Sequence, residues 1–364
     1  VWHGYVKSLD QYRTEYAPDH VHYIDELPEV IQKLQPSSAF CLDQHSEEQF
    51  RSHGPEISTN SEALIEALTD ARVIKTEDEL DCLRKASQVN DKAYERVIRH
   101  WKPGMYEYQA KAMFTEVQMS HGLQQDAYNG IYASGPNSAI LHYVSNTRKT
   151  QDGELFLIDA GFEYKGYAAD FSRAFPVNGR FTSDQAAVYD AVLTAQKQVI
   201  EAIRPGVRME DLHMMAARTM MEGLLEMGII KGSLDDLMEA NIFALFFPHG
   251  LGHFLGLDTH DVGGYPKGVE RIDRPGIFYL RARRELEAGM VITIEPGIYF
   301  VPAVLEPALH DPTKRMFLNT EKLHQFMGFG GIRIEDDIVV TENGYENLTH
   351  IAKERDEIER LMNS

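Results

Sequence analysis

The most constraining feature of the sequence is residues 155–175, LFLIDAGFEYKGYAADFSRAF, in which two apolar runs flank a short polar bend. Each run carries one aspartate, Asp159 after LFLI and Asp170 after GYAA. A buried carboxylate is costly unless it is paired or holds a metal ion. The stretch EYKG predicts the turn of a β-hairpin, with Gly166 suited to a positive φ.

A turn centred between Tyr164 and Lys165 would place Asp159 directly opposite Asp170 across the two strands. Opposed residues share a face, with Cβ atoms roughly 4.5–5.5 Å apart. Two carboxylates at that distance repel each other unless one is protonated or a cation lies between them. The alternative is a register shifted by one residue, with both aspartates apart in solvent, and the hairpin alone does not decide between the two.

Two later strand-like segments also carry acids among apolar residues. In MVITIEPG the isoleucines alternate with Thr293 and Glu295, and in GIRIEDDIVV they alternate with Arg333 and Glu335. Either glutamate alone is more simply explained as a solvent-facing residue of a half-exposed strand. Four strands that each bear one carboxylate, beside a histidine-containing motif, weaken that explanation.

That motif is FFPHGLGHFLGLDTHDVGG, residues 246–264, which contains His249, His253 and His260. Histidine is the commonest metal ligand and titrates near neutral pH. Closely spaced glycines indicate a backbone pressed against another group. The simpler alternative is a glycine-rich turn in which the histidines have no special role.

Together, the four acids and one of these histidines would form a site rich in oxygen ligands, with one nitrogen and no sulfur. Carboxylates suit Mn²⁺ and Mg²⁺, and a histidine also admits Zn²⁺, Co²⁺ or Fe²⁺. Four carboxylates would outweigh the charge of one divalent ion, whereas two such ions balance them and leave room for a bridging hydroxide. Two ions roughly 3.5–4 Å apart can activate water for hydrolysis.

Composition narrows the classes of partner. The chain is 43% hydrophobic and 25% charged, as is typical of a globular protein, and its net charge of -20 argues against a nucleic-acid partner. No run approaches the ~18 apolar residues of a membrane span, so no membrane partner is expected. Cys41 and Cys82 are the only cysteines, which fits a reducing, cytoplasmic compartment and excludes cysteine-ligated zinc.

Along the chain, pairs of helices precede groups of strands twice over. Thr76 and Glu79 form a capping-box signature, and helical periodicity predicts helices within 76–100, 103–122, 182–203 and 208–228. These segments predict an α+β catalytic domain over residues 73–364. Residues 1–72 are polar and mixed, and we expect them to be the remnant of an N-terminal domain and a linker.

The order of Asp159, ten intervening residues, Asp170, and then HGLGHFLGL, TIEPG and RIEDD resembles the metallopeptidases with the pita-bread fold. That family includes methionyl aminopeptidases, aminopeptidase P, prolidase and creatinase. Within it, HDVGGYP and the stretch from RIDRPG to GIYF are most similar to prolidases of the eukaryotic type. The resemblance extends over about residues 76–364. It implies a pita-bread (creatinase/aminopeptidase) fold, a curved antiparallel sheet covered by helices, here preceded by a partial N-terminal domain.

The resemblance also implies roles for single residues. The ligands of two divalent metal ions, expected to be Mn²⁺ with Zn²⁺, Co²⁺ or Fe²⁺ as alternatives, would be Asp159, Asp170, His253, Glu295 and Glu335. Glu295 would also carry a proton from the attacking water to the leaving amine. His249 and His260 would lie near the scissile carbonyl, and His260 would help to hold the oxyanion.

The substrate-binding residues implied by the resemblance are His142, Arg281 and Arg333. His142 and Arg281 match positions that bind the C-terminal carboxylate of a dipeptide, and an arginine fork suits a carboxylate. Arg333 would support the site from the strand that also bears Glu335.

These observations predict a cytoplasmic, metal-dependent dipeptidase that hydrolyses Xaa-Pro dipeptides through a hydroxide bridging two metal ions. One alternative is aminopeptidase P, which acts on longer Xaa-Pro peptides. Arg281 discriminates between them, because an arginine that binds the carboxylate restricts substrates to dipeptides. The other alternative is a non-catalytic binding module on the same fold. A homodimer is expected from the resemblance, although the short N-terminal part weakens that expectation.

Overall fold

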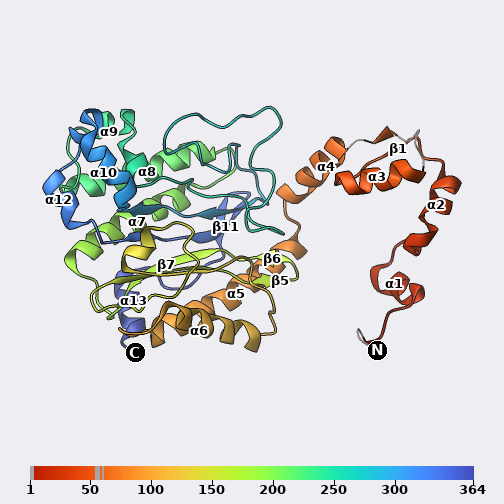
Figure 1. Ribbon diagram of the computed structural model, residues 1–364, viewed down its shortest axis with the longest axis horizontal. Helices are drawn as coiled ribbons and strands as arrows, with labels where there is room; N and C mark the ends of the chain where they lie inside the picture. Colours follow the sequence, from red (N-terminus) through yellow and green to blue (C-terminus); the bar gives the residue numbers. More distant parts are fainter. Residues whose placement is uncertain (1–3, 54–57, 60) are drawn as a thin grey trace. The chain divides into compact units, whose positions relative to one another are not determined.

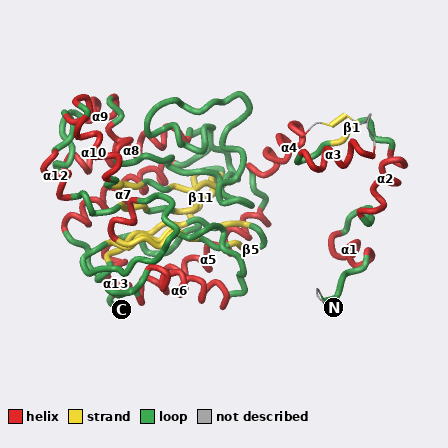
Figure 2. The backbone as a smooth tube through the Cα atoms, in the orientation of Figure 1, coloured by secondary structure: helices red, strands yellow, loops and turns green. Residues whose placement is uncertain are grey.

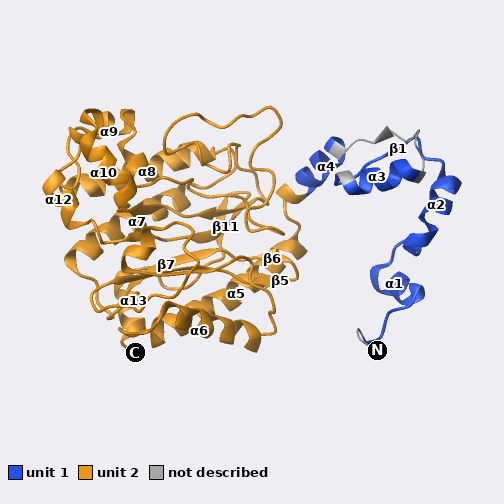
Figure 3. Ribbon diagram, viewed as in Figure 1, with its two compact units in different colours: residues 1–71 blue, residues 72–364 orange. Residues whose placement is uncertain are grey.

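The computed structural model describes residues 4–53, 58–59 and 61–364 (Figure 1). It divides into two compact units, residues 1–71 and residues 72–364 (Figure 3). No helix in the described ranges is long and apolar enough to cross a membrane. That residues 1–72 are the remnant of an N-terminal domain stays a prediction.

The first unit is made of short elements. They are α1 (Leu9–Tyr16), the 3-10 helix η1 (Ile24–Glu26), α2 (Leu27–Leu34), β1 (Ser38–Ala39), α3 (Gln44–His53), β2 (Ser58–Thr59) and α4 (Ser61–Val73), which continues into the second unit. β1 and β2 pair in parallel. Its described buried cluster consists of Ile31, Ala39 and Cys41. So small a cluster contributes little hydrophobic stabilisation.

The second unit begins with α5 (Glu77–His100), which packs against α6 (Glu107–Ser120). The predicted capping box is confirmed, since the Glu79 carboxylate accepts a hydrogen bond from the Thr76 backbone N–H at 2.7 Å. An antiparallel sheet follows, in the order β3 (Ile131–Ser134), β4 (Leu155–Ala160) and β7 (Phe171–Pro176). Trp101, at the end of α5, stacks on Phe156 of β4 with ring centroids 4.3 Å apart. The helices therefore share a hydrophobic core with the sheet.

A second helix pair, α7 (Ser183–Ala202) and α8 (Met209–Glu226), precedes a second antiparallel sheet. Its order is β12 (Gly344–Asn347), β11 (Asp336–Thr341) and β8 (Val291–Ile294), and β9 (Gly297–Tyr299) pairs with β10 (Gly331–Arg333). Figure 2 shows the strands between the two helix pairs. The remaining elements are η2 (Gly135–Ala139), β5 (Glu163–Tyr164), β6 (Tyr167–Ala168), α9 (Leu234–Glu239), η3 (Ile242–Leu245), α10 (Pro302–His310), α11 (Pro312–Arg315), α12 (Thr320–Gln325) and α13 (Arg355–Met362). Antiparallel sheets covered by helices are the architecture that the sequence predicts.

The predicted hairpin forms with a different centre. Tyr164 of β5 pairs with Tyr167 of β6, so that Lys165 and Gly166 are the two turn residues, with φ of 52° and 88°. A two-residue turn of this kind needs a positive φ at both central positions. Because Lys165 adopts one as well as Gly166, the centre lies one residue further along the chain than predicted.

This shift changes the partner of the first aspartate. In the ladder between β4 and β7, Asp159 pairs with Ser172, so the prediction that it directly faces Asp170 is wrong. Asp170 lies in the break between β6 and β7. Ser172 also pairs with Glu335 through backbone hydrogen bonds, the Glu335 N–H donating to the Ser172 carbonyl at 3.0 Å. That bridge joins the two halves of the unit at the acidic residues.

Candidate metal centre and active site

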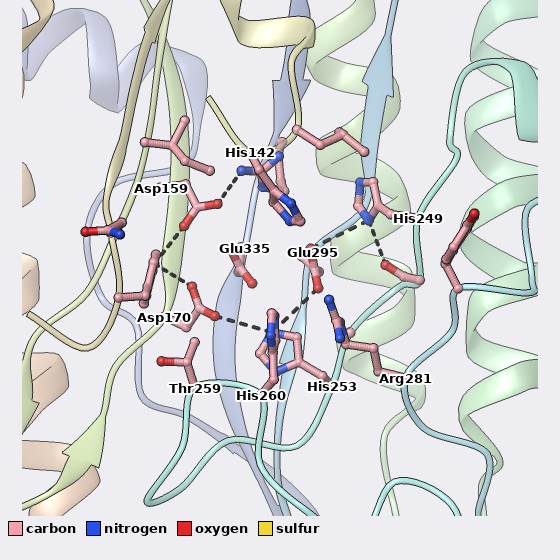
Figure 4. Close-up of a pocket in the computed structure, with 18 of the residues that line it drawn as sticks. His142, Asp159, Asp170, His249, His253, Thr259, His260, Arg281, Glu295 and Glu335 are labelled. Carbon is pink, nitrogen blue, oxygen red and sulfur yellow. Dashed lines mark hydrogen bonds and ion pairs between the residues drawn. The ribbon is translucent and has the colours of Figure 1, made fainter. Parts of the chain in front are cut away.

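Three of the four acidic residues named from the sequence lie at interruptions of the strands. Asp159 lies within β4, whereas Asp170 precedes β7, Glu295 follows β8, and Glu335 lies between β10 and β11. The expectation that each strand carries one carboxylate is therefore wrong for three of the four. At an interruption the side chain is released from the strict alternation of a strand, so these acids can turn toward one point (Figure 4).

Three residues form a compact group of potential metal ligands. Asp170, His253 and Glu335 are buried, and each offers one ligand atom within 4.8 Å of the others. His253 Nε2 lies 3.3 Å from Asp170 Oδ2. The Nδ1 atom of His253 lies 2.9 Å from the Phe254 carbonyl oxygen. A proton on Nδ1 donates to that oxygen and leaves Nε2 as a lone pair directed at the carboxylates, which is the usual arrangement of a metal-binding histidine.

Asp159 is connected to this group through a tyrosine. The Tyr128 hydroxyl lies 2.7 Å from Asp159 Oδ1 and 2.6 Å from Asp170 Oδ1. The other oxygen of Asp159 accepts a hydrogen bond from Arg333. Burial raises the pKa of Asp159, and the nearby Asp170 adds to the effect against the opposing influence of Arg333.

Glu295 lies between two histidines. Its Oε1 atom is 3.7 Å from His253 Nε2, and its Oε2 atom is 3.6 Å from His249 Nδ1. Burial raises the pKa of Glu295 to about 7. Burial, followed by the charges of Asp170 and Glu295, also raises the pKa of Glu335 well above its usual range. The cluster thus concentrates more negative charge than its surroundings stabilise.

These properties fit a site for divalent metal ions. The donors are carboxylate oxygens and one imidazole nitrogen, a set that suits Mn²⁺, Zn²⁺, Co²⁺ or Fe²⁺. A cation would relieve the mutual repulsion that raises the pKa of Glu335. The group of Asp170, His253 and Glu335 could hold one ion, and Asp159 and Glu295 border it.

A chain of polar contacts leads from the carboxylates to His249. Arg333 Nη1 donates to the Tyr299 hydroxyl at 2.8 Å, and that hydroxyl lies 2.9 Å from His249 Nε2. Arg333 Nε also donates to the Ser172 hydroxyl at 2.8 Å. Burial, with Arg333 as the next cause, lowers the pKa of His249 to about 3. His249 is therefore neutral at pH 7, with Nε2 accepting from Tyr299.

The remaining predicted residues line one cavity of about 1100 Å³, which the metal-site residues also line. His142 reaches it from the turn after η2, and His260 and Arg281 both reach it from the long segment between η3 and β8 (Figure 4). The His260 ring lies edge-on to that of His253, with centroids 4.5 Å apart. Partial burial, followed by the charge of His253, lowers the pKa of His260 to about 4.

Sequence reasoning missed three hydroxyl groups in the site, those of Tyr128, Ser172 and Tyr299. Each donates to or accepts from a residue that the sequence did identify. Ser172 Oγ, for example, donates to Glu335 Oε2 at 2.7 Å. Tyrosine and serine are common in strands and loops, and neither their spacing nor their neighbours distinguish these three. Only the closure of the sheets brings them to the acids.

Comparison with known proteins places this geometry in context. Residues 81–342 match the model of metallopeptidase family M24. The chain is 43% identical over 374 aligned residues to the Xaa-Pro dipeptidase of Homo sapiens, which covers 99% of this chain and 76% of that protein. It is also 37% identical to a probable Xaa-Pro aminopeptidase of Verticillium alfalfae, over 100% of this chain and 79% of that one.

Solved structures of aminopeptidase P have the same fold. The enzyme from Escherichia coli in complex with substrate aligns with a TM-score of 0.87 and 34% identity, over 100% of this chain and 79% of the other. Proline aminopeptidase P II from Yersinia pestis aligns with a TM-score of 0.85 and 34% identity, over 100% and 80% of the two chains. The predicted fold is therefore confirmed.

Proposed function

Because this chain belongs to metallopeptidase family M24 and is similar over nearly its whole length to Xaa-Pro dipeptidases, we propose that it hydrolyses Xaa-Pro dipeptides. The observation that carries this proposal is the buried group of Asp170, His253 and Glu335, whose ligand atoms lie within 4.8 Å of one another beside a large cavity. A peptidase of this kind needs a metal centre that a peptide can reach, and this group of residues has the donors and the access for one.

We propose that Asp159 and Glu295 complete a site for two divalent ions, with Asp170 and Glu335 each shared between them. Two divalent charges would balance the four carboxylates. Mn²⁺ is the ion we propose, because oxygen donors dominate the set. When bound, the two ions would lower the pKa of a water molecule between them so that it can attack as hydroxide at neutral pH.

Glu295 would transfer the proton that the attacking water loses. Its pKa of about 7 allows the carboxyl to gain and lose a proton near neutral pH. It would accept the proton of the attacking water and deliver it to the proline nitrogen as the peptide bond breaks. His249, whose Nδ1 lies 3.6 Å from Glu295 Oε2, would hold the carboxyl in place as a neutral neighbour.

His260 would donate a hydrogen bond to the oxygen of the scissile carbonyl. With a pKa lowered to about 4, its imidazole is uncharged at pH 7 and donates from one ring nitrogen. A neutral donor beside the carbonyl stabilises the negative charge that develops on the oxygen during attack. Its position edge-on to His253 supports this assignment, because it keeps His260 next to the metal site.

Arg281 and His142 would bind the carboxylate of the dipeptide. Arg333 would hold neighbouring site residues in position. Arg281 is exposed to the cavity, and within the described ranges its guanidinium has no hydrogen bond or ion pair. A free guanidinium can form two parallel hydrogen bonds with a carboxylate. Arg333 is instead occupied by Asp159, Ser172 and Tyr299, which favours a positioning role over direct contact with substrate.

A second candidate function is that of aminopeptidase P. The cavity of about 1100 Å³ lies above the ~300–1,000 Å³ typical of small-molecule sites, so a dipeptide would fill only part of it. A longer peptide could occupy the rest, provided that Arg281 does not close the path beyond proline.

The deciding experiment combines metal analysis with hydrolysis of Gly-Pro and of Gly-Pro-Ala. We expect two divalent ions per chain and a kcat/KM for Gly-Pro that is at least tenfold above that for the tripeptide, on the order of one charge-assisted contact. Equal or faster cleavage of the tripeptide would favour aminopeptidase P. If the metal-loaded protein cleaves neither peptide, both peptidase functions are rejected, and the remaining hypothesis is a non-catalytic binding module.

We also propose a cytoplasmic location and a homodimer. Both Cys41 and Cys82 are free thiols, which fits a reducing compartment. The homodimer follows from the resemblance to the family, and sedimentation of the purified chain tests it. A monomer that retains full activity would separate catalysis from assembly.

A further inference from the structure

Glu107, the first residue of α6, is a buried carboxylate outside the metal centre. Its side chain is fully enclosed, yet it accepts five hydrogen bonds. They come from the Ser134 N–H and hydroxyl, the Asn137 amide, the Tyr143 hydroxyl and the Arg148 N–H, at 2.8, 2.7, 3.1, 2.7 and 2.8 Å. Five donors saturate the acceptor capacity of a carboxylate, which explains how the charge is tolerated there.

The two oxygens of Glu107 hold different parts of the chain. Oε1 accepts from Ser134, at the end of β3, and from Asn137 in η2. Oε2 accepts from Tyr143 and Arg148. Tyr143 and Arg148 lie near the two ends of the segment 141–148, which carries His142. One carboxylate therefore fastens this segment to both the sheet and α6.

Arg148 has further contacts, since its guanidinium donates to the Ser134 hydroxyl and pairs with Glu154, but the part of the segment around His142 has few. Ile140, His142, Val144, Ser145 and Thr147 are exposed, and residues 143–148 have no regular secondary structure. The Tyr143 ring packs on the cluster of Ile131, Ala133 and Leu157. Asn146 accepts a hydrogen bond from the Tyr132 N–H at 3.0 Å and donates to the Gly130 carbonyl at 3.2 Å. Asn146 thus secures the later half, and the part around His142 depends on Tyr143 and its bond to Glu107.

We propose that Glu107 is a positioning residue for substrate, one that sets the place of His142 in the cavity through Tyr143. This inference rests on the proposed function, in which His142 helps to bind the dipeptide carboxylate. Glu107 acts at a distance from the reacting atoms, so its loss should affect the binding of substrate more than the chemical step.

The first test is Glu107→Gln, which keeps the side-chain shape but turns one acceptor into an amide that can only donate. We expect KM for Gly-Pro to rise roughly ten- to a hundredfold, the range of one lost hydrogen bond to a charged group. We expect kcat to change less than about threefold, because removal of uniform binding raises KM alone. In a His142→Ala background, Glu107→Gln should raise KM no further, since both changes remove the same interaction.

Tyr143→Phe is the milder variant, and it decides the question if Glu107→Gln does not fold. It removes the 2.7 Å hydrogen bond to Glu107, together with a weaker interaction with Thr147, and keeps the ring that packs on the sheet. Tyr189→Phe is the matched control, because it removes a similar 2.8 Å bond, from a buried tyrosine to the Lys353 carbonyl. We expect Tyr143→Phe to raise KM and Tyr189→Phe to leave it unchanged.

Hydrogen exchange of the amides of residues 140–145 gives a readout that does not need activity. Exchange should be faster in Glu107→Gln and Tyr143→Phe than in the wild type or Tyr189→Phe. Unchanged exchange overturns the anchoring role itself, and faster exchange with an unchanged KM overturns the role in substrate positioning. A wild-type protein that does not hydrolyse Gly-Pro rejects the proposed function and the positioning role with it, while the exchange data still report whether Glu107 anchors the segment.

Discussion

The ammonium group of Lys75 lies 3.0 Å from Asp261 Oδ2, and both side chains are 1% exposed. Arg72 contacts the other oxygen of the same carboxylate. This buried cluster ties the segment that precedes α5 to the residue that directly follows His260. The position of a proposed catalytic histidine therefore depends on charges far from it in the sequence.

Lys75→Met tests this ion pair. Removal of one partner of a buried pair costs about 3–5 kcal/mol, and because Arg72 still contacts Asp261 we expect a loss near the lower value, ~3 kcal/mol, in the free energy of unfolding. Urea denaturation measures it. The matched control is Lys197→Met, which breaks an exposed pair with Glu354 and should cost less than about 1 kcal/mol. Equal effects of the two variants would contradict a special role for the buried pair.

Asp159→Asn tests the two-metal site. The change keeps the side-chain shape but removes one negative charge, so we expect one ion per chain instead of two. The kcat for Gly-Pro should fall at least about a hundredfold, since even outer-shell partners of a metal cost ~10–100-fold. Metal analysis and steady-state kinetics measure both. Asp190→Asn, on α7, is the control, and retention of two ions by Asp159→Asn would remove Asp159 from the ligand set.

The buried His213 predicts a pH dependence of stability. Burial lowers its pKa to about 4, whereas an unfolded histidine titrates near ~6.5. The unfolded state thus binds the proton more readily, and the contribution of His213 is complete above pH ~6.5 and is lost as pH falls toward 4. The loss amounts to about 3 kcal/mol.

His213→Phe isolates this contribution, because His213 stacks on Phe247 and a phenyl ring can do the same. The free energy of unfolding of the wild type minus that of the variant should fall between pH 7 and pH 4. A difference that stays constant over this range would show that His213 is protonated equally in both states.

Arg281→Ala tests the choice between dipeptidase and aminopeptidase. If Arg281 binds the proline carboxylate, kcat/KM for Gly-Pro should fall roughly ten- to a hundredfold, the range of a charge-assisted contact. Hydrolysis of Gly-Pro amide, which lacks that carboxylate, should barely change. Arg218→Ala, in an exposed pair with Asp235, controls for the loss of a surface charge. An equal loss on the acid and the amide would mean that Arg281 acts through folding.

The acids of the proposed metal centre could be singled out from the sequence because each lies in a distinct local pattern. A carboxylate beside an apolar run, as at Asp159, is unusual enough to be noticed without a structure, whereas Glu295 and Glu335 stand out only together with the other acids and the histidine motif. Their exact pairing could not be predicted, because the register of the hairpin depends on whether Lys165 adopts a positive φ as well as Gly166. That choice depends on which residues the strands bury as well as on the turn residues themselves.

The residues that support the site could not be predicted from the sequence, for a different reason. Tyr128 and Glu107 are ordinary in their local sequence, and each gains its meaning only from partners more than twenty residues away, such as Asp159 and Ser134. Their contacts arise when the two sheets and the helices close around the site. A local pattern cannot specify which hydroxyl or carboxylate will be enclosed in this way.

The single hydroxyl of Tyr128 stands within 2.7 Å of Asp159 and 2.6 Å of Asp170, yet a phenol has only one hydrogen to donate. Only one of the two carboxylates can take that hydrogen at a time, and burial raises the pKa values of the neighbouring acids Glu295 and Glu335, which favours their protonated forms. Cations that bind these carboxylates would displace such protons. The heat of metal binding will consequently depend on the ionisation enthalpy of the buffer, and this protein will hold its ions less tightly as the medium becomes more acidic.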